Sequence, residues 1–258
     1  MRILFLDETN TELTKISNFF IYGGIFFPAE IAHNLHLKIV ELRNKAGFKP
    51  RDQFKFDTHS RPSSIPIDAF NQAKDKLINL CIDSKVLFIV YIVHHGIARK
   101  HSLKTKIEWA SNEIINQFDS ILRLEKDCGL VIFDKLPFKG EFRYINNLFN
   151  DGITTSTSQN APHVPTNILG YSMSTSGASH FNSATDIILG AFRYCVNAED
   201  SSGAAKKLFP KILNLLYGQI GKDGKKAVGE YGLLIRPRRN MLYSSEYDKL
   251  LKKLKSFL

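Results

Sequence analysis

The sequence predicts an α/β protein, in which a mixed sheet is flanked by helices and followed by a basic helical C-terminal extension. Short runs of β-branched and aromatic residues alternate with longer segments whose apolar residues recur at helical spacing. Of the 258 residues, 43% are hydrophobic and 23% are charged. This ordinary globular composition excludes a disordered tail, a collagen-like fibre and a coiled-coil rod.

The N-terminal third is expected to contain two strands before the first helix. Residues 3–6 form a short apolar run that ends in acidic residues, and residues 19–27 form a second β-rich run beside it. A short connection predicts that these two strands are antiparallel. Residues 28–42 have a proline at the start and apolar residues at helical spacing, which predicts a helix. Residues 54–56 are expected as a short strand in a polar loop, and residues 67–80 as a second helix.

The middle of the chain repeats the pattern of strand and helix. Residues 86–93 form a continuous β-branched and aromatic run, typical of a central strand that is covered on both faces. Residues 104–125 predict a helix, and residues 130–133 predict a short buried strand that ends in Asp134. Residues 167–172 are expected as one more strand.

The last part of the chain is expected to be helical. Residues 184–196 predict an apolar helix that begins near Asp186, and residues 206–217 and 247–257 also have helical spacing. We expect residues 1–200 to form the core and residues 201–258 to form an extension packed on it.

Positive charge is concentrated in this extension. Residues 201–258 contain 13 Lys and Arg and 4 Asp and Glu, a balance of +9, whereas the rest of the chain has 22 against 21. Clustered basic residues favour contact with a polyanion such as nucleic acid, although a lysine-rich helix is also typical of a solvated face. The expected nucleic-acid contacts are Lys225, Lys226, Arg236, Arg238 and Arg239, which would bind the backbone without reading its sequence.

The chain carries no pattern for export or for membrane insertion. The apolar start turns acidic too early for a secretory signal, and no uncharged apolar run reaches the length of a membrane-spanning helix. Cys81, Cys128 and Cys195 lie too far apart to indicate a zinc site or a disulfide framework. We expect a cytoplasmic protein with no membrane partner.

Acidic residues stand at the ends of several expected core elements. Asp7 and Glu8 close the first strand, Asp134 closes a later strand, and Asp186 lies near the start of an apolar helix. A carboxylate beside buried strands is costly unless a cation, hydrogen bonds or a basic side chain compensates it. Converging carboxylates suit Mg²⁺ or Mn²⁺. Each acid could instead act locally, Asp7 as a turn cap, Asp134 as a partner of Lys135 and Asp186 as an N-terminal helix acid.

Four motifs occur in a characteristic order. They are Leu-Asp-Glu-Thr at residues 6–9, Gly-Gly-Ile-Phe-Phe at residues 23–27, Phe-Lys-Phe at residues 54–56 and Thr-Asp-Ile-Ile-Leu-Gly-Ala at residues 185–191. The first, third and fourth are similar to the Asp-Glu-Ser-Gly start, the Glu-x-Lys segment and the Ala-Asp-Leu-Ile-Ala-Gly-Ala helix of the prokaryotic and viral family known as domain of unknown function 3800. The resemblance covers roughly residues 1–194.

The resemblance implies a ribonuclease H-like fold, in which carboxylates from the first strand, a central strand and a late helix meet at one edge of a mixed sheet. On this basis Asp7, Asp134 and Asp186 would hold Mg²⁺ or Mn²⁺, and Glu8 would be a ligand or accept a hydrogen bond. Lys55 would neutralise phosphate charge.

Two positions depart from the family pattern. Gln53 occupies the place of the glutamate before the lysine, and Ser183 occupies the place of a glutamine three residues before the helix aspartate. Asp57 and Glu113 are the alternatives for the missing acidic ligand.

The sequence therefore predicts a metal-dependent nuclease that acts on DNA or RNA through carboxylate-bound ions, with the basic extension holding the strand. Two alternatives stay open. One is a catalytically silent nucleic-acid-binding or regulatory protein, for which Gln53 is the sign. The other is a hydrolase of a small phosphoester, which would have a closed pocket and no role for the basic residues after Ser201.

Overall fold

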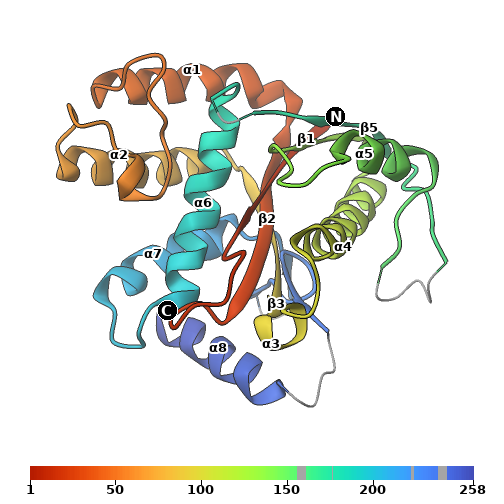
Figure 1. Cartoon of the computed structure of the whole chain (residues 1–258). Coiled ribbons are helices and arrows are strands. Elements are labelled where there is room, and N and C mark those ends of the chain that lie inside the picture. The colour runs from red at the N-terminus through yellow and green to blue at the C-terminus, as the bar shows by residue number, and fades with distance from the viewer. Residues whose placement is uncertain (156–160, 176, 222–223, 238–242) are drawn as a thin grey trace.

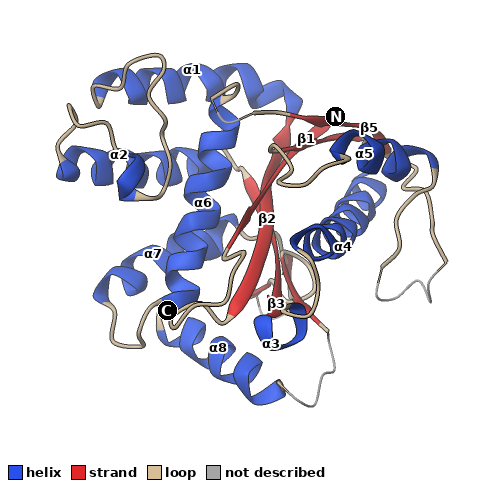
Figure 2. Cartoon of the chain, in the orientation of Figure 1, coloured by secondary structure: helices blue, strands red, loops and turns tan. Residues whose placement is uncertain are grey.

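The computed structural model describes residues 1–155, 161–175, 177–221, 224–237 and 243–258. These residues form a six-stranded mixed sheet with helices on both faces (Figures 1 and 2), which confirms the expected α/β class. The strands, in their order across the sheet, are β5 (Ile168–Met173), β4 (Gly129–Phe133), β1 (Arg2–Thr9), β2 (Phe19–Pro28), β3 (Leu87–His94) and β8 (Leu233–Arg236). The pairs β1–β2 and β2–β3 are antiparallel, whereas β1–β4, β4–β5 and β3–β8 are parallel.

The helices form two layers, each with its own apolar core. One layer consists of α1 (Ala29–Lys45), α2 (Ile67–Asp83), α6 (His180–Asn197), α7 (Gly203–Leu215) and α8 (Ser244–Ser256). The other contains α4 (Leu103–Glu125) and α5 (Glu141–Asn150), and Figure 1 shows both on the opposite side of the sheet from α6. Short elements complete the described chain: the 3-10 turn η1 (Thr58–Ser60), α3 (His95–Ala98), β6 (Gln219–Ile220) and β7 (Lys226–Ala227).

Strand β2 pairs with β1 at the centre of the sheet, and this pairing sets the position of the last residues of β1. Asp7 lies opposite Gly23 in the register, and Glu8 lies opposite Tyr22. A Cβ on the neighbouring Gly24 would overlap the backbone oxygen of Phe5, so the close approach of the two strands requires glycine there. Because successive side chains alternate across a sheet, Asp7 is directed to the α6 face and Glu8 to the α4 face.

Helix α6 crosses the sheet over β1 and β2 (Figure 1). Its N-cap is Ser179, whose side chain accepts a hydrogen bond from the Phe181 N–H. The helix therefore begins at His180, earlier than the sequence predicts. Asp186 lies in its second turn, so the interpretation of Asp186 as an N-terminal helix acid is wrong.

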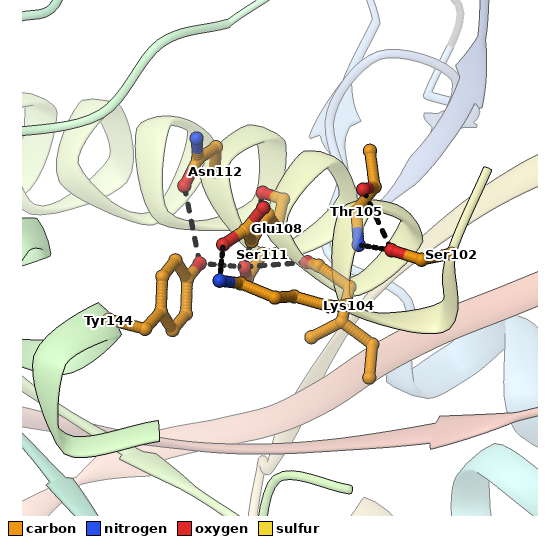
Figure 3. Close-up of polar contacts among 8 residues, drawn as sticks. Ser102, Lys104, Thr105, Glu108, Ser111, Asn112 and Tyr144 are labelled. Atoms are coloured by element: carbon orange, nitrogen blue, oxygen red, sulfur yellow. Dashed lines mark hydrogen bonds and ion pairs between the residues drawn. The ribbon is translucent and has the colours of Figure 1, made fainter. Parts of the chain in front are cut away.

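Helix α5 was not expected, and it holds the chain that follows Asp134 against α4. The Tyr144 hydroxyl of α5 bonds to the Ser111 hydroxyl and donates to Asn112 Oδ1 at 3.4 Å (Figure 3). Ser111 also donates to the backbone oxygen of Ile107 at 2.7 Å. These bonds satisfy polar groups in a largely apolar interface between the two helices.

The residues after 200 contribute to the sheet as well as to the helical layer. Strand β8 extends the sheet beside β3, and α7 and α8 pack on the same core as α6. Lys253 of α8 donates to the backbone oxygens of Val196 and Ala198, at 2.6 and 3.1 Å, and so caps the C-terminal end of α6. In the described part of the chain, no helix has the length and apolarity needed to cross a membrane.

Candidate functional site

Three of the expected carboxylates line one cavity of about 410 Å³. Asp7 comes from β1, Asp134 directly follows β4, and Asp186 comes from α6. Strands β1 and β4 are parallel neighbours, so their C-terminal ends meet at the same edge of the sheet. Helix α6 lies across that edge and brings Asp186 to it.

Each carboxylate is oriented by one hydrogen bond. Asp186 Oδ1 accepts from the Phe56 N–H at 2.7 Å, and Asp134 Oδ1 accepts from Asn182 Nδ2 at 3.1 Å. Asp7 Oδ1 accepts from the Glu8 N–H at 2.8 Å. These contacts come from backbone and amide donors, so they orient the acids without neutralising their charge.

Burial, followed by neighbouring charges, raises the pKa values of Asp7, Glu8 and Asp186. Burial raises the pKa of Asp7 well above its ordinary value, and the charges of Glu8, Asp186 and Asp134 raise it further. Burial, with a contribution from Asp134, raises the pKa of Glu8 to about 7. Burial also raises the pKa of Asp186, and the Phe56 N–H and the charge of Lys55 oppose this effect. A cluster of this kind concentrates negative charge that a cation would relieve.

Two cations flank the cluster. Lys55 lines the cavity, and its charge partly offsets the rise in the pKa values of Glu8 and Asp186. Arg193 lies seven residues after Asp186 on α6, where its guanidinium donates to Thr9 Oγ1 at 3.0 Å and lies over the Phe56 ring. We did not predict Arg193 from the sequence. Its spacing of seven residues from Asp186 was the available signal, because seven residues are about two helical turns and place both side chains on one face.

Asn182 is the second site residue that the sequence analysis missed. It lies one turn before Asp186 on α6, and its Oδ1 is buried without a hydrogen-bond partner among the described residues. The family pattern has an amide three residues before the aspartate, and this chain has its amide four residues before it, at the i−4 position that shares a helix face.

Residues 54–56 are not a strand, so that prediction is wrong. Phe54 is buried against Phe48 and Phe70 and takes no part in strand pairing, whereas the N–H of Phe56 bonds to Asp186. The alternation of polar and aromatic residues at 53–56 has the period of a strand in sequence, but Phe54 packs in an aromatic cluster here. The Gln53 side chain is exposed and lines the same cavity.

The alternative acidic ligands, Asp57 and Glu113, do not line the cavity of about 410 Å³. Asp57 is exposed and caps η1 by accepting from the His59 N–H at 2.9 Å. It borders a separate small cavity of about 50 Å³ that Asp7, Glu8 and Arg193 also line. Glu113 is buried on α4, on the opposite face of the sheet from α6, and its Oε2 accepts from Arg236 Nε at 2.8 Å.

Those of the expected nucleic-acid contacts that the structure describes do not line the carboxylate cavity. Arg236 is buried, and it pairs with Glu113 and with Glu230. Lys226 donates to the backbone oxygens of Leu213 and Asn214. Lys225 is exposed, and Arg238 and Arg239 lie outside the described residues.

The donor set fits a hard divalent cation by its chemistry. Asp7, Asp134 and Asp186 supply carboxylate oxygens, and the buried Asn182 Oδ1 supplies a neutral oxygen. Within the residues that the structure describes, however, no three His, Cys, Asp or Glu side chains are grouped closely enough to hold an ion together. Mg²⁺ is commonly held by one or two carboxylates, with waters or substrate phosphates at its other positions. The set therefore suits an ion whose coordination is completed by the substrate.

Comparison with models of known protein families found no family that matches the chain, and comparison with curated proteins found no match. The resemblance to domain of unknown function 3800 therefore remains a prediction.

Proposed function

We propose that this protein is a divalent-metal-dependent nuclease with a ribonuclease H-like arrangement of its sheet. The supporting observation is the single cavity that brings together Asp7, Asp134 and Asp186. These residues come from the first strand, the end of a central strand and a late helix of a mixed sheet, which is the arrangement that the family resemblance implies.

In this proposal the carboxylates of Asp7, Asp134 and Asp186 would share Mg²⁺ or Mn²⁺, with one or two of them binding the ion directly and substrate phosphate completing its coordination. Glu8 would be a further ligand or a hydrogen-bond acceptor. When bound, the ion lowers the pKa of a water molecule and neutralises charge that develops on the phosphate. Lys55 binds a phosphate oxygen beside the carboxylates. Phe56 and Asn182 hold Asp186 and Asp134 in place through the hydrogen bonds described above.

The direct test is cleavage of labelled single-stranded and double-stranded DNA and RNA in Mg²⁺, in Mn²⁺ and in chelator. We expect metal-dependent cleavage by the wild type and at least a ~100-fold loss in Asp7→Asn, which keeps the shape of the side chain but removes its charge. Equal cleavage by the two proteins would remove Asp7 from the mechanism.

A hydrolase of small phosphoesters is the second candidate. The cavity volume of about 410 Å³ is in the range of small-ligand sites, and the described basic residues predicted to hold nucleic acid lie elsewhere. Hydrolysis of p-nitrophenyl phosphate or bis(p-nitrophenyl) phosphate without any cleavage of polynucleotides would favour this candidate over a nuclease.

A further inference from the structure

Arg43 of α1 lines the cavity but is buried, and the more accessible positive side chains at the cavity come from residues 49–61, before α2. Lys49 and Arg51 are exposed and Lys55 is half-buried, and both Arg51 and Lys55 line the cavity. Among the described residues, none of these three side chains has an ion-pair partner within 4.0 Å. Their charge is therefore available to an anionic ligand.

The backbone of this segment is fixed by contacts with its neighbours. Buried Arg43 donates to the backbone oxygen of Asp52 at 2.7 Å, and Lys74 donates to that of Phe56 at 3.0 Å. The acids within the segment bond to the segment itself, since Asp52 accepts from the Lys49 N–H and Asp57 accepts from the His59 N–H. The segment thus presents its cations from a preorganised backbone, which lowers the entropic cost of binding.

Much of the positive charge near the C-terminus is used within the fold, away from the acids. Lys253 caps α6, Lys211 pairs with Asp75, and Lys226 binds backbone oxygens at the end of α7. Lys253 contacts the backbone oxygen of Val196. Val196 lies ten residues after Asp186, or about 15 Å further along the helix axis. Figure 1 accordingly shows α7 and α8 beside the C-terminal end of α6.

A second part of the cavity lining is uncharged. Residues 152–185 contain no Asp, Glu, Lys or Arg, and Ser179, His180, Asn182 and Ser183 of this stretch line the cavity. A cavity of about 410 Å³ has the size of a small-ligand pocket and cannot enclose a duplex.

From these observations we infer that the protein binds single-stranded nucleic acid with its phosphate backbone along residues 49–61, while sugars and bases face the uncharged lining at residues 177–183. The inference rests on the proposed function for the role of the acids, and it replaces the C-terminal extension as the nucleic-acid surface. Lys55 contacts the phosphate beside the carboxylates, and Arg51 and Lys49 contact phosphates further out.

The test compares two double variants that each remove two positive charges. One is Lys49→Ala with Arg51→Ala. The matched control is Lys252→Ala with Lys255→Ala, two exposed lysines of α8. Both pairs are made in the Asp7→Asn protein, so that the probe stays intact. Fluorescence anisotropy measures binding from 50 to 300 mM NaCl in chelator. The fluorescein-labelled probes are a 20-nucleotide DNA single strand, an RNA strand of the same sequence and the DNA duplex. Circular dichroism and thermal unfolding confirm that each variant is folded.

We expect the first pair to weaken single-strand binding about tenfold at 100 mM NaCl and to reduce the salt slope by about 1.4, or about 0.7 for each lost phosphate contact. The control pair should change affinity less than about twofold, and the duplex should bind at least about tenfold more weakly than the single strands. An equal or larger effect of the control pair, tighter binding of the duplex, or the absence of salt-sensitive binding would overturn the inference. Cleavage by the wild type is measured separately, so the proposed function can fail while this surface is upheld, or the reverse.

Discussion

At the scale of single residues, the candidate site is defined by carboxylates that are costly to ionise. Burial and mutual repulsion raise the pKa values of Asp7, Glu8 and Asp186, and in metal-free protein this cost is a property of the fold. The sequence indicated the four acids because they stand at the ends of apolar elements. Asn182 and Arg193 share a helix face with Asp186 by their spacing, but their hydrogen-bond partners Asp134 and Thr9 lie on other elements and are known only from the folded chain.

Glu8 should make the metal-free protein less stable as pH rises. A carboxyl whose pKa is raised by folding contributes stability that is fully present below its unfolded value of 4.5 and is lost as pH rises through its folded value of about 7. The shift corresponds to about 3 kcal/mol. Urea unfolding in chelator between pH 4.5 and 8 should therefore show a decline in stability that Glu8→Gln reduces.

Glu41→Gln is the matched control. Glu41 is exposed, and Lys45 lowers the pKa of Glu41, so this change should not reduce the decline. A Glu8→Gln protein with the same pH profile as the wild type would show that Glu8 is not buried among the other acids.

Asp7→Asn should stabilise the metal-free protein at pH 8, because it removes one charge from the cluster. It should also abolish the stabilisation of the wild type by Mn²⁺, which binding to the folded state would provide at about 2.7 kcal/mol when the ion is at 100 times its Kd. Thermal unfolding with and without Mn²⁺ measures both effects. A Mn²⁺ shift that is the same in wild type and variant would place the ion elsewhere.

At the scale of elements, apolar periodicity predicted most of the fold. The runs for β2, β3 and α4 are long and regular, so packing and pattern agree there. Helix α5 and strand β8 were missed because each is short and gains its stability from tertiary contacts, α5 from Tyr144 on α4 and β8 from pairing with β3. The residues around Phe54 were mistaken for a strand because their alternation of aromatic and polar residues has the period of a strand, whereas Phe54 packs in an aromatic cluster.

The contact between α6 and residues 49–61 should tolerate no extra atoms at Gly190. A Cβ there would overlap the Phe56 side chain, whose N–H orients Asp186. We expect Gly190→Ala to destabilise the protein by about 1 to 3 kcal/mol and to reduce activity at temperatures where it remains folded. Chemical denaturation and cleavage assays measure the two effects.

Gly203→Ala provides the control for Gly190→Ala. Gly203 is the first residue of α7 and has open space at its Cβ position, so alanine should be neutral or slightly stabilising. Equal stability changes at the two glycines would mean that α6 and Phe56 are not in close contact.

At the scale of the whole molecule, the C-terminal residues complete the sheet and the helical layer. Composition predicted their positive charge, but not its use, because Arg236, Lys226 and Lys253 are committed to internal contacts that only the folded chain creates. Charge counts along the sequence therefore do not show which basic residues remain available to a ligand, and the predicted contacts of Lys225, Arg238 and Arg239 with nucleic acid stay predictions.

Arg236→Leu tests this structural role. It removes a buried ion pair with Glu113 and a second with Glu230, so we expect a loss of about 3 to 5 kcal/mol in unfolding free energy. Nucleic-acid affinity of the protein that remains folded should be unchanged. Lys255→Ala, on the exposed face of α8, should alter neither quantity. Weakened binding by Arg236→Leu without a loss of stability would instead assign the guanidinium to the ligand.

Anomalous diffraction from crystals grown with Mn²⁺ and a short single-stranded oligonucleotide would show whether the acids share a cation. We expect a manganese peak in the cavity, about 2.0 to 2.5 Å from an oxygen of Asp7 and from an oxygen of Asp134 or Asp186. A cavity with bound oligonucleotide but no manganese, or manganese held only at surface carboxylates, would contradict it.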